Sequence, residues 1–292
     1  VRRAGTTLAY RNQLMTKLDL PPPSDAARCA GERFAKLVEL MRTLRSSAGC
    51  AWDREQTLAS LRPFILEEAY EVVDAIDRNS SEDLCDELGD LLLEAVFVAQ
   101  ICAETGEFTI ADSANAINAK LIRRHPHVFG KGMARELSSQ EVKTQWEQIK
   151  SQERGERTTG SGLLDDIPDS LPSLMRASRI GARTAKVGFD WVESRDVLEK
   201  IDEELAELRE AIDADEQAHV DEELGDLLFT LANLARKLNL DPESSLRSAN
   251  QKFKRRFRLL EENLNKQGRS LREATSEELE QEWQAVKLTP HS

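Results

Sequence analysis

The same pattern of acidic residues occurs twice in this chain, and this repeat constrains the fold more than any other feature. Asp90 follows Glu68 by 22 residues, and Asp226 follows Glu204 by the same interval. Self-similarity on this scale indicates a duplicated structural unit, so we expect two copies of one domain. The two sets are Glu67, Glu68, Glu71, Glu87 and Asp90 in the first half, and Glu203, Glu204, Glu207, Glu223 and Asp226 in the second.

Basic and aromatic residues repeat behind each acidic set at matching offsets. All four tryptophans fall into two matched pairs, of which Trp52 and Trp191 precede the acidic sets. The residues that follow are Asn118, Lys120, Arg124, Trp146 and Lys150 in the first half, and Asn250, Lys252, Arg256, Trp283 and Lys287 in the second. The chain is therefore a tandem duplication.

Domain limits follow from the repeat and from the composition between its copies. Residues 151–162 are polar and rich in glycine, without an apolar period, which is typical of a linker. The first thirty residues hold a triple proline and no continuous apolar run, so we expect a polar leader and no secretion signal. The expected ranges are a leader over 1–30, a first domain over 31–152, a linker over 153–164 and a second domain over 165–289.

Apolar residues in both halves recur at the spacing of an amphipathic helix. Such stripes cover 61–76 and 84–95 in the first half, and 198–212 and 220–231 in the second. Residues that suit helix N-caps stand before several of these segments, and strand signals are nearly absent. The sequence therefore predicts an all-α protein with a helical hairpin at the centre of each half.

The charge and composition exclude several classes of protein. With 53 acidic and 40 basic side chains the net charge is −13, which argues against a general nucleic-acid binder. No apolar run reaches the ~18 residues that a spanning helix needs, so we expect a soluble protein that does not enter a membrane. The four cysteines have no CxxC spacing, which predicts reduced thiols in a cytoplasmic protein rather than a zinc site or disulfides.

The acidic sets have the chemistry of a metal site. Residues three or four apart share one helix face, and two antiparallel helices can bring their carboxylates into one cluster. Such a cluster of like charges needs compensation, and oxygen ligands without His or Cys are what Mg²⁺ or Mn²⁺ prefers. Gly89 and Gly225 lie within these helices, where a glycine costs about 1 kcal/mol relative to alanine. They predict a close helix approach beside the carboxylates.

The basic residues of the second half suit a phosphorylated ligand. Lys252 and Arg256 are four apart and so share one helix face, where they can clamp phosphate oxygens. In an acidic chain, this combination favours a polyphosphate bound through metal. Trp191 or Trp283 could cover a nucleobase, although a lone tryptophan is more often part of a core.

Together these motifs resemble those of the MazG nucleoside triphosphate pyrophosphohydrolases, and the tandem arrangement is that of the two-domain members. The resemblance rests on the paired acidic motifs, the basic stretch 250–257 and the terminal segment from Trp283 to Lys287, and it covers about 31–289. It implies four-helix-bundle cores completed by dimerisation and a need for Mg²⁺, which Mn²⁺ can replace. The implied reaction converts nucleoside triphosphates to monophosphate and pyrophosphate, in the cleaning or regulation of the nucleotide pool.

The resemblance also implies roles for individual residues. Glu203 would orient water and accept its proton, and Lys252 would contact the triphosphate. The first half departs in its basic stretch, where Leu121 and Ile122 replace aromatic and basic residues, so we expect the second half to be the competent one. The implied metal ligands are Glu204, Glu207, Glu223 and Asp226, and also Glu68, Glu71, Glu87 and Asp90; the implied substrate contacts are Asn250, Lys252, Arg256, Trp283 and Lys287; a second site of the same kind would use Glu67, Lys120, Arg124, Trp146 and Lys150.

Two other classes of protein fit parts of the sequence. A di-iron carboxylate bundle needs paired Glu-x-x-His motifs. One such motif runs from Glu216 to His219, but its counterpart in the first half ends on Asp83. The duplicated helices could also form a regulatory or scaffold module that holds metal for stability and has no activity.

Overall fold

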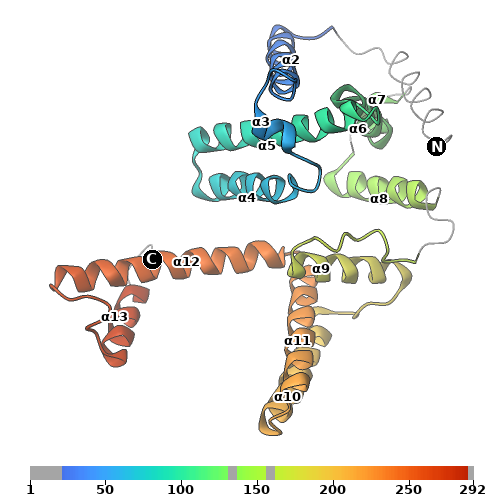
Figure 1. Ribbon diagram of the computed structural model, residues 1–292. Coiled ribbons are helices and arrows are strands. Elements are labelled where there is room, and N and C mark those ends of the chain that lie inside the picture. Colours follow the sequence, from blue (N-terminus) through green and yellow to red (C-terminus); the bar gives the residue numbers. More distant parts are fainter. Residues whose placement is uncertain (1–21, 131–136, 156–161, 289–292) are drawn as a thin grey trace. The chain divides into compact units, whose positions relative to one another are not determined.

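The structure, a computed structural model, describes residues 22–130, 137–155 and 162–288. These residues form helices and no strands (Figure 1), as the sequence predicts. The chain divides into two compact units, unit 1 (residues 1–156) and unit 2 (residues 157–292), and the division lies within the segment expected to be a linker. None of the helices in the described ranges is long and apolar enough to cross a membrane.

Unit 1 is built around the antiparallel hairpin of α4 and α5, with α2 packed on α5. Met41 of α2 and Val96 and Phe97 of α5 are buried together with Leu61 in its core. The first helix of the described residues begins at Asp25, within the last six residues of the expected leader, most of which lies outside the described residues. The helices of unit 1 are α2 (Asp25–Leu44), α3 (Ala51–Glu55), α4 (Arg62–Arg78), α5 (Ser81–Glu104), α6 (Ile110–Arg124), α7 (Pro126–Phe129) and α8 (Ser139–Gly155).

The turn between α4 and α5 explains why the hairpin forms where the sequence places it. Asn79 ends α4 in the left-handed conformation with φ 55°, which asparagine tolerates better than most residues. Ser80 then caps α5, since its side chain accepts a hydrogen bond from the backbone N–H of Asp83 at 3.4 Å. These two residues lie between the apolar stripes 61–76 and 84–95, so the separation of the two predicted helices is confirmed.

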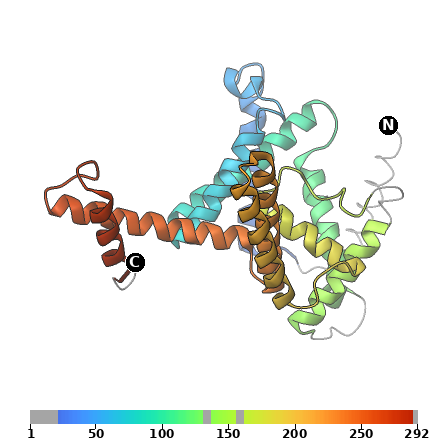
Figure 2. The same ribbon diagram turned by 90° about the horizontal axis from the view of Figure 1, so that it is seen from below.

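Unit 2 has a second hairpin, formed by α10 and α11, with α9 packed on α11. Asp241 caps α12 by accepting a hydrogen bond from the N–H of Ser244 at 2.7 Å, as its position before a proline predicts. In both views α12 leads away from the hairpin, and α13 folds back against its far half (Figures 1 and 2). The elements of unit 2 are α9 (Ser173–Thr184), the 3₁₀ turn η1 (Ala185–Val187), α10 (Ser194–Asp213), α11 (Gln217–Lys237), α12 (Pro242–Lys266) and α13 (Ser276–Leu288).

The close helix approach expected at Gly89 and Gly225 is wrong for the single chain. A Cβ added at either glycine would meet no atom of the described residues within 4 Å, so both glycines border open space there. The close approach occurs instead at Gly181 of α9, where a Cβ would lie 2.8 Å from Cγ of Asn233 and 2.9 Å from Nε of Arg236, both on α11. Glycine is therefore required where α9 crosses α11.

Candidate functional site

Three carboxylates of unit 2 form a compact cluster between the two helices of its hairpin. Glu204 and Glu207 lie one turn apart on α10, and Glu223 faces them from α11. One oxygen from each lies within 4.8 Å of the others. Glu204 is only 5% exposed and Glu223 only 8%. Because buried carboxylates are costly without partners, this cluster requires positive charge nearby.

Lys200 supplies part of that charge, and the sequence analysis missed it. Its Nζ lies 2.8 Å from Oε1 of Glu203 and 3.0 Å from Oε1 of Glu204. Its hydrogen bonds to Glu203 and then Glu204 raise the pKa of the lysine. The signal was readable, since a lysine four residues before a glutamate on a helix lies within reach of it. Lys200 therefore partly neutralises the cluster in the absence of a cation.

The remaining charge of the cluster fits a divalent cation. Burial, followed by repulsion from Glu223, raises the pKa of Glu207, so ionising all three carboxylates together is unfavourable. Three hard oxygen donors from two helices are a suitable ligand set for Mg²⁺ or Mn²⁺. His219 also reaches Glu223, with Nε2 2.9 Å from Oε1. Its unit 1 counterpart Asp83 pairs with an arginine instead, so the second Glu-x-x-His motif of a di-iron bundle is missing.

Two predicted members of the acidic set in unit 2 do not belong to the group of three carboxylates. Asp226 is exposed and is not within the 4.8 Å group that the other three residues form. Glu203 is also exposed and is held by Lys200. Three of the four expected ligands are thus brought together, and the expected water-orienting glutamate lies next to them in the sequence.

Unit 1 has the matching cluster but not the compensating lysine. Glu68, Glu71 and Glu87 each place an oxygen within 4.8 Å of the others. Phe64 stands where unit 2 has Lys200, and a further buried carboxylate, Glu94, stands where unit 2 has a threonine. Among the described residues, one oxygen of Glu68 and one of Glu94 are buried with no hydrogen-bond partner. The sequence analysis missed Glu94, which lies one turn beyond the expected set.

Electrostatic repulsion in unit 1 is correspondingly stronger. Burial and then the charges of Asp90 and Glu71 raise the pKa of Glu68, and burial and then Asp90 raise that of Glu94. Asp90 lies outside the 4.8 Å group, as Asp226 does in unit 2. The unit 1 cluster therefore fits a cation chemically, but it has more negative charge to neutralise.

The basic residues predicted to bind substrate in unit 2 lie apart from the carboxylates. Lys252 and Arg256 lie on α12, which leads away from the α10–α11 hairpin (Figure 1). Trp283 of α13 packs against Phe253, with ring centroids 4.9 Å apart. Asn250 and Lys287 are exposed on the same two helices. The described residues of unit 2 therefore form one acidic cluster and, apart from it, one basic cluster with aromatic residues.

Two arginines in the basic stretch of unit 1 are already paired with a carboxylate. Arg124 Nη2 lies 2.6 Å from Oε2 of Glu153, and Arg123 Nη2 lies 2.6 Å from Oε1 of the same carboxylate. These arginines lower the pKa of Glu153 to about 2. Trp146 packs edge-on against His125, with ring centroids 5.1 Å apart. Glu67 and Lys120 are exposed, and the side chain of Lys150 lies outside the described residues.

Comparisons with known proteins match both units. Residues 56–129 and 193–258 each match the MazG nucleotide pyrophosphohydrolase domain. The chain is 47% identical over 258 residues to the nucleoside triphosphate pyrophosphohydrolase/pyrophosphatase MazG of Thermotoga maritima, covering 88% of this chain and 97% of that one.

Two further relatives have the same kind of name. The nucleoside triphosphate pyrophosphohydrolase of Escherichia coli K12 is 48% identical over 257 residues, covering 86% of this chain and 96% of the relative. A protein of that name from Mycobacterium tuberculosis is 35% identical over 161 residues, covering 54% of this chain and 47% of the relative. The repeat found in the sequence therefore corresponds to two copies of one known domain.

Proposed function

The chain belongs to the MazG family and is a nucleoside triphosphate pyrophosphohydrolase; from this premise we propose that unit 2 is its catalytic unit. One observation carries the proposal: Glu204, Glu207 and Glu223 form a cluster, two of them buried, with Lys200 beside it, whereas unit 1 has no lysine in that place. A site that acts on triphosphates needs positive charge next to its metal ligands, because negative charge develops on the leaving group.

We propose Mg²⁺ as the cofactor, held by the three clustered carboxylates with Asp226 at their edge. The ion would neutralise the triphosphate and lower the pKa of a bound water. Support comes from the donor set, which contains only hard oxygens in the cluster, and from the raised pKa of Glu207, which indicates carboxylates that lack a full counter-charge. Mn²⁺ has the same ligand preference and should substitute for it.

The residues of unit 2 then divide the chemical work. Glu203 is exposed beside the cluster, where its carboxylate can accept a proton from the attacking water. The water oxygen forms a bond to the α-phosphorus, and the bond from this phosphorus to the α,β-bridging oxygen breaks. Lys200, which lies beside Glu204, would help to balance the charge of the pyrophosphate that leaves. Lys252 and Arg256 would hold the outer phosphates.

The identity of the first product tests this reaction. Full-length protein incubated with each nucleoside triphosphate and Mg²⁺ should release nucleoside monophosphate and pyrophosphate in equal amounts, as followed by ³¹P NMR. Adding EDTA should stop the release. Orthophosphate and nucleoside diphosphate as first products would overturn the proposal, because they require attack at the γ-phosphorus.

We further propose that a second copy of the chain completes the site. Leu224, Leu228 and Leu231 form a stripe of half-exposed leucines on α11, and Gly225 beside them borders open space. A matching helix packed there would bury the stripe and use the space at the glycine. The basic cluster of α12 and α13, which lies away from the carboxylates of its own unit, would then face those of the partner's unit 2.

Mixing two inactive variants tests this arrangement. Glu204→Gln removes the acidic part of the site, and Lys252→Ala with Arg256→Ala removes the basic part. If the site is shared between chains, random mixing should restore about a quarter of the parental activity, because half the dimers carry one intact site of two. Light scattering should show a dimer before and after mixing. A monomer, or a dimer mixture without recovered activity, would contradict a shared site.

We propose a cytoplasmic location on the basis of the cysteines. Cys29, Cys50, Cys85 and Cys102 are all free thiols. Free thiols without a disulfide framework are typical of proteins in a reducing compartment. The acidic surface also supports nucleoside triphosphates rather than nucleic acids as ligands, since polymeric phosphate is bound mainly through an excess of basic residues.

A further inference from the structure

A pocket of about 360 Å³ lies in unit 1 where α6 and the loop before it meet α4 and α5. Its walls are mainly apolar, and they include Val98 of α5, Phe108 of the loop and Ile110 at the start of α6. Two polar residues, Glu94 of α5 and Ser113 of α6, also belong to the lining. The volume is near the lower end of the range of about 300–1,000 Å³ for small-molecule sites, so it suits a small ligand.

Glu94 is buried in this lining without a partner for one of its oxygens. The residue is only 9% exposed, and its Oε2 has no hydrogen-bond partner among the described residues. Asp90 and Glu68, the charged residues with which Glu94 interacts electrostatically, are carboxylates and repel it. A buried carboxylate in such surroundings is destabilising unless a cation reaches it. Glu94 therefore points to a positively charged group that a ligand supplies.

The corresponding positions of unit 2 differ in both charge and size. At the repeat interval, Thr230 stands in the place of Glu94, and Leu231 stands in the place of Ala95. Ala95 lines the pocket of unit 1, and its small side chain leaves room that a leucine would fill. Thr230 is buried like Glu94 but is neutral. Unit 1 thus combines the space and the charge that unit 2 lacks at these positions.

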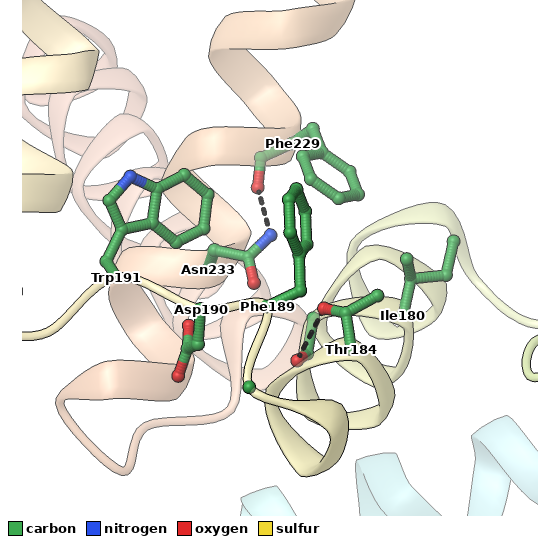
Figure 3. A pocket seen from close by; sticks show the side chains of 9 residues that line it. Ile180, Thr184, Phe189, Asp190, Trp191, Phe229 and Asn233 are labelled. Carbon is green, nitrogen blue, oxygen red and sulfur yellow. Dashed lines mark hydrogen bonds between the residues drawn. The ribbon is translucent and has the colours of Figure 1, made fainter.

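A pocket of the same volume in unit 2 shows how polar lining residues can be satisfied within the chain. It lies where the end of α9 and the loop after it meet α11 (Figure 3). Asn233 donates from Nδ2 to the carbonyl oxygen of Phe229 at 3.1 Å, and its Oδ1 accepts from Nε of Arg236 at 3.0 Å. Asp190 of the same lining lies 2.5 Å from Nη2 of Arg236. These polar groups are held by the chain itself, whereas Oε2 of Glu94 is left to a ligand.

The lining of the unit 1 pocket favours an organic cation over a metal ion. Mg²⁺ needs an octahedral set of oxygen ligands, and it usually keeps several waters. The described lining offers one carboxylate, Glu94, and one hydroxyl, that of Ser113, and its apolar walls cannot hydrogen-bond to such waters. An alkylammonium ion suits both parts of the pocket, because its head can meet the carboxylate while its carbon chain buries apolar surface.

We propose that this pocket of unit 1 binds a small aliphatic ammonium ion. The charged head pairs with Glu94, and the carbon chain lies against Val98 and Phe108. Because Glu94 is outside the group of three carboxylates, the site is distinct from the acidic cluster of unit 1. A bound ammonium ion also reduces the repulsion between Glu94 and Asp90. The proposal does not depend on which unit is catalytic, so it can fail while the proposed function stands.

Calorimetric titration of the full-length protein with a series of alkylammonium chlorides tests the proposal. From propylammonium to hexylammonium, affinity should rise about fourfold with each added methylene that reaches the apolar walls. Hexanoate, which has a similar chain but the opposite charge, should not bind. Glu94→Gln should weaken binding of hexylammonium at least about tenfold, because it removes a hydrogen bond to a charged group. Glu94→Thr, which copies unit 2, should act in the same way.

Two further variants serve as controls. Glu82→Gln makes the same charge change at an exposed residue of α5 and should leave the affinity for hexylammonium within about twofold. Ala95→Leu copies unit 2 at an exposed position and should block the pocket without changing its charge. It keeps the test decisive if a change at the buried Glu94 prevents folding.

Four results would overturn the ammonium site. Affinity that ignores chain length, or equal losses in Glu94→Gln and Glu82→Gln, would mean general attraction of cations to an acidic surface. Displacement of hexylammonium by Mg²⁺ in the parent would assign Glu94 to a metal site. If no amine binds and Glu94→Gln changes the mass in light scattering, the pocket belongs to a contact with a second copy of the chain. If no amine binds and the mass is unchanged, the pocket has no cationic ligand of this class.

Discussion

Units 1 and 2 share three clustered carboxylates but differ at the residues around them. Unit 2 has Lys200 beside the cluster and Asn233 in a pocket, whereas unit 1 has Phe64 and Phe97 at the corresponding positions. Both unit 1 residues belong to its hydrophobic core or pack against it. The comparison teaches that duplicated acidic residues are not sufficient for a nucleotide site. Lys200 beside the carboxylates distinguishes the unit that we propose to be catalytic.

The largest expected difference between the units is in catalysis. Glu204→Gln should lower pyrophosphate release at least ~100-fold, because it removes a buried metal ligand at the proposed reaction centre. Glu68→Gln is the matched change in unit 1 and should leave the rate within about twofold. Steady-state kinetics at saturating Mg²⁺ measure both. An equal loss in the two variants would mean that both units catalyse.

The second prediction concerns stability, where a substitution in unit 1 should have the larger effect. Phe97→Ala should destabilise unit 1 by about 3–5 kcal/mol, since it empties a packed core. Asn233→Ala should cost unit 2 only about 1–2 kcal/mol, for the lost hydrogen bonds. Hydrogen exchange of α5 and α11 amides reports each unit separately. Equal protection losses would contradict the view that one position packs a core and the other lines a pocket.

The third prediction concerns the lysine that only unit 2 has. Lys200→Met leaves Glu204 buried without its partner and should destabilise the metal-free protein by about 1–3 kcal/mol. Excess Mg²⁺ should restore most of this loss, because the cation supplies the missing charge. Thermal unfolding in EDTA and in Mg²⁺ measures the difference. A loss of the same size under both conditions would show that the lysine acts through packing alone.

The smallest predicted effect is the pH dependence of the arginine pair in unit 1. In the folded protein the pKa of Glu153 is lowered from 4.5 to about 2. Between pH 2 and pH 4.5 the unfolded chain therefore binds a proton at Glu153 that the folded chain does not bind. The ion pair therefore stabilises unit 1 fully above pH 4.5, and this contribution is lost as the pH falls toward 2. Glu153→Gln should cost roughly 1 kcal/mol at pH 7 and nearly nothing at pH 2. Urea unfolding at several pH values measures it, and a constant difference would contradict the assignment.

The helical hairpins and most of the carboxylate cluster could be predicted from the sequence. Helix spacing and cap residues such as Ser80 and Asp241 are local signals, so they can be recognised without knowledge of the fold. The approach of Glu223 to Glu204 could also be predicted from nearby sequence, because two helices joined by a short turn lie antiparallel and bring these residues together. These features required no long-range information.

The remaining features depended on tertiary contacts that no local pattern reports. The role of Gly225 was misjudged because no atom of the described residues lies close to it. Nothing in the sequence distinguishes Asn233 from an exposed polar residue of a helix. Its burial depends on the packing of α9 against it at Gly181. Lys252 and Arg256 share a helix face as expected, but the direction of α12 places them away from the carboxylates. The helical period predicts which residues share a face, but it does not predict the direction of the helix relative to the other helices.

The central claim is that this chain holds two acidic clusters but one nucleotide site, in unit 2. Calorimetric titration with the α,β-methylene analogue of ATP and Mg²⁺ tests it most directly, with the parent, Glu68→Gln and Glu204→Gln compared. The account predicts one nucleotide bound per chain in the parent and in Glu68→Gln, and none in Glu204→Gln. Two nucleotides per chain, or loss of binding in Glu68→Gln, would contradict it.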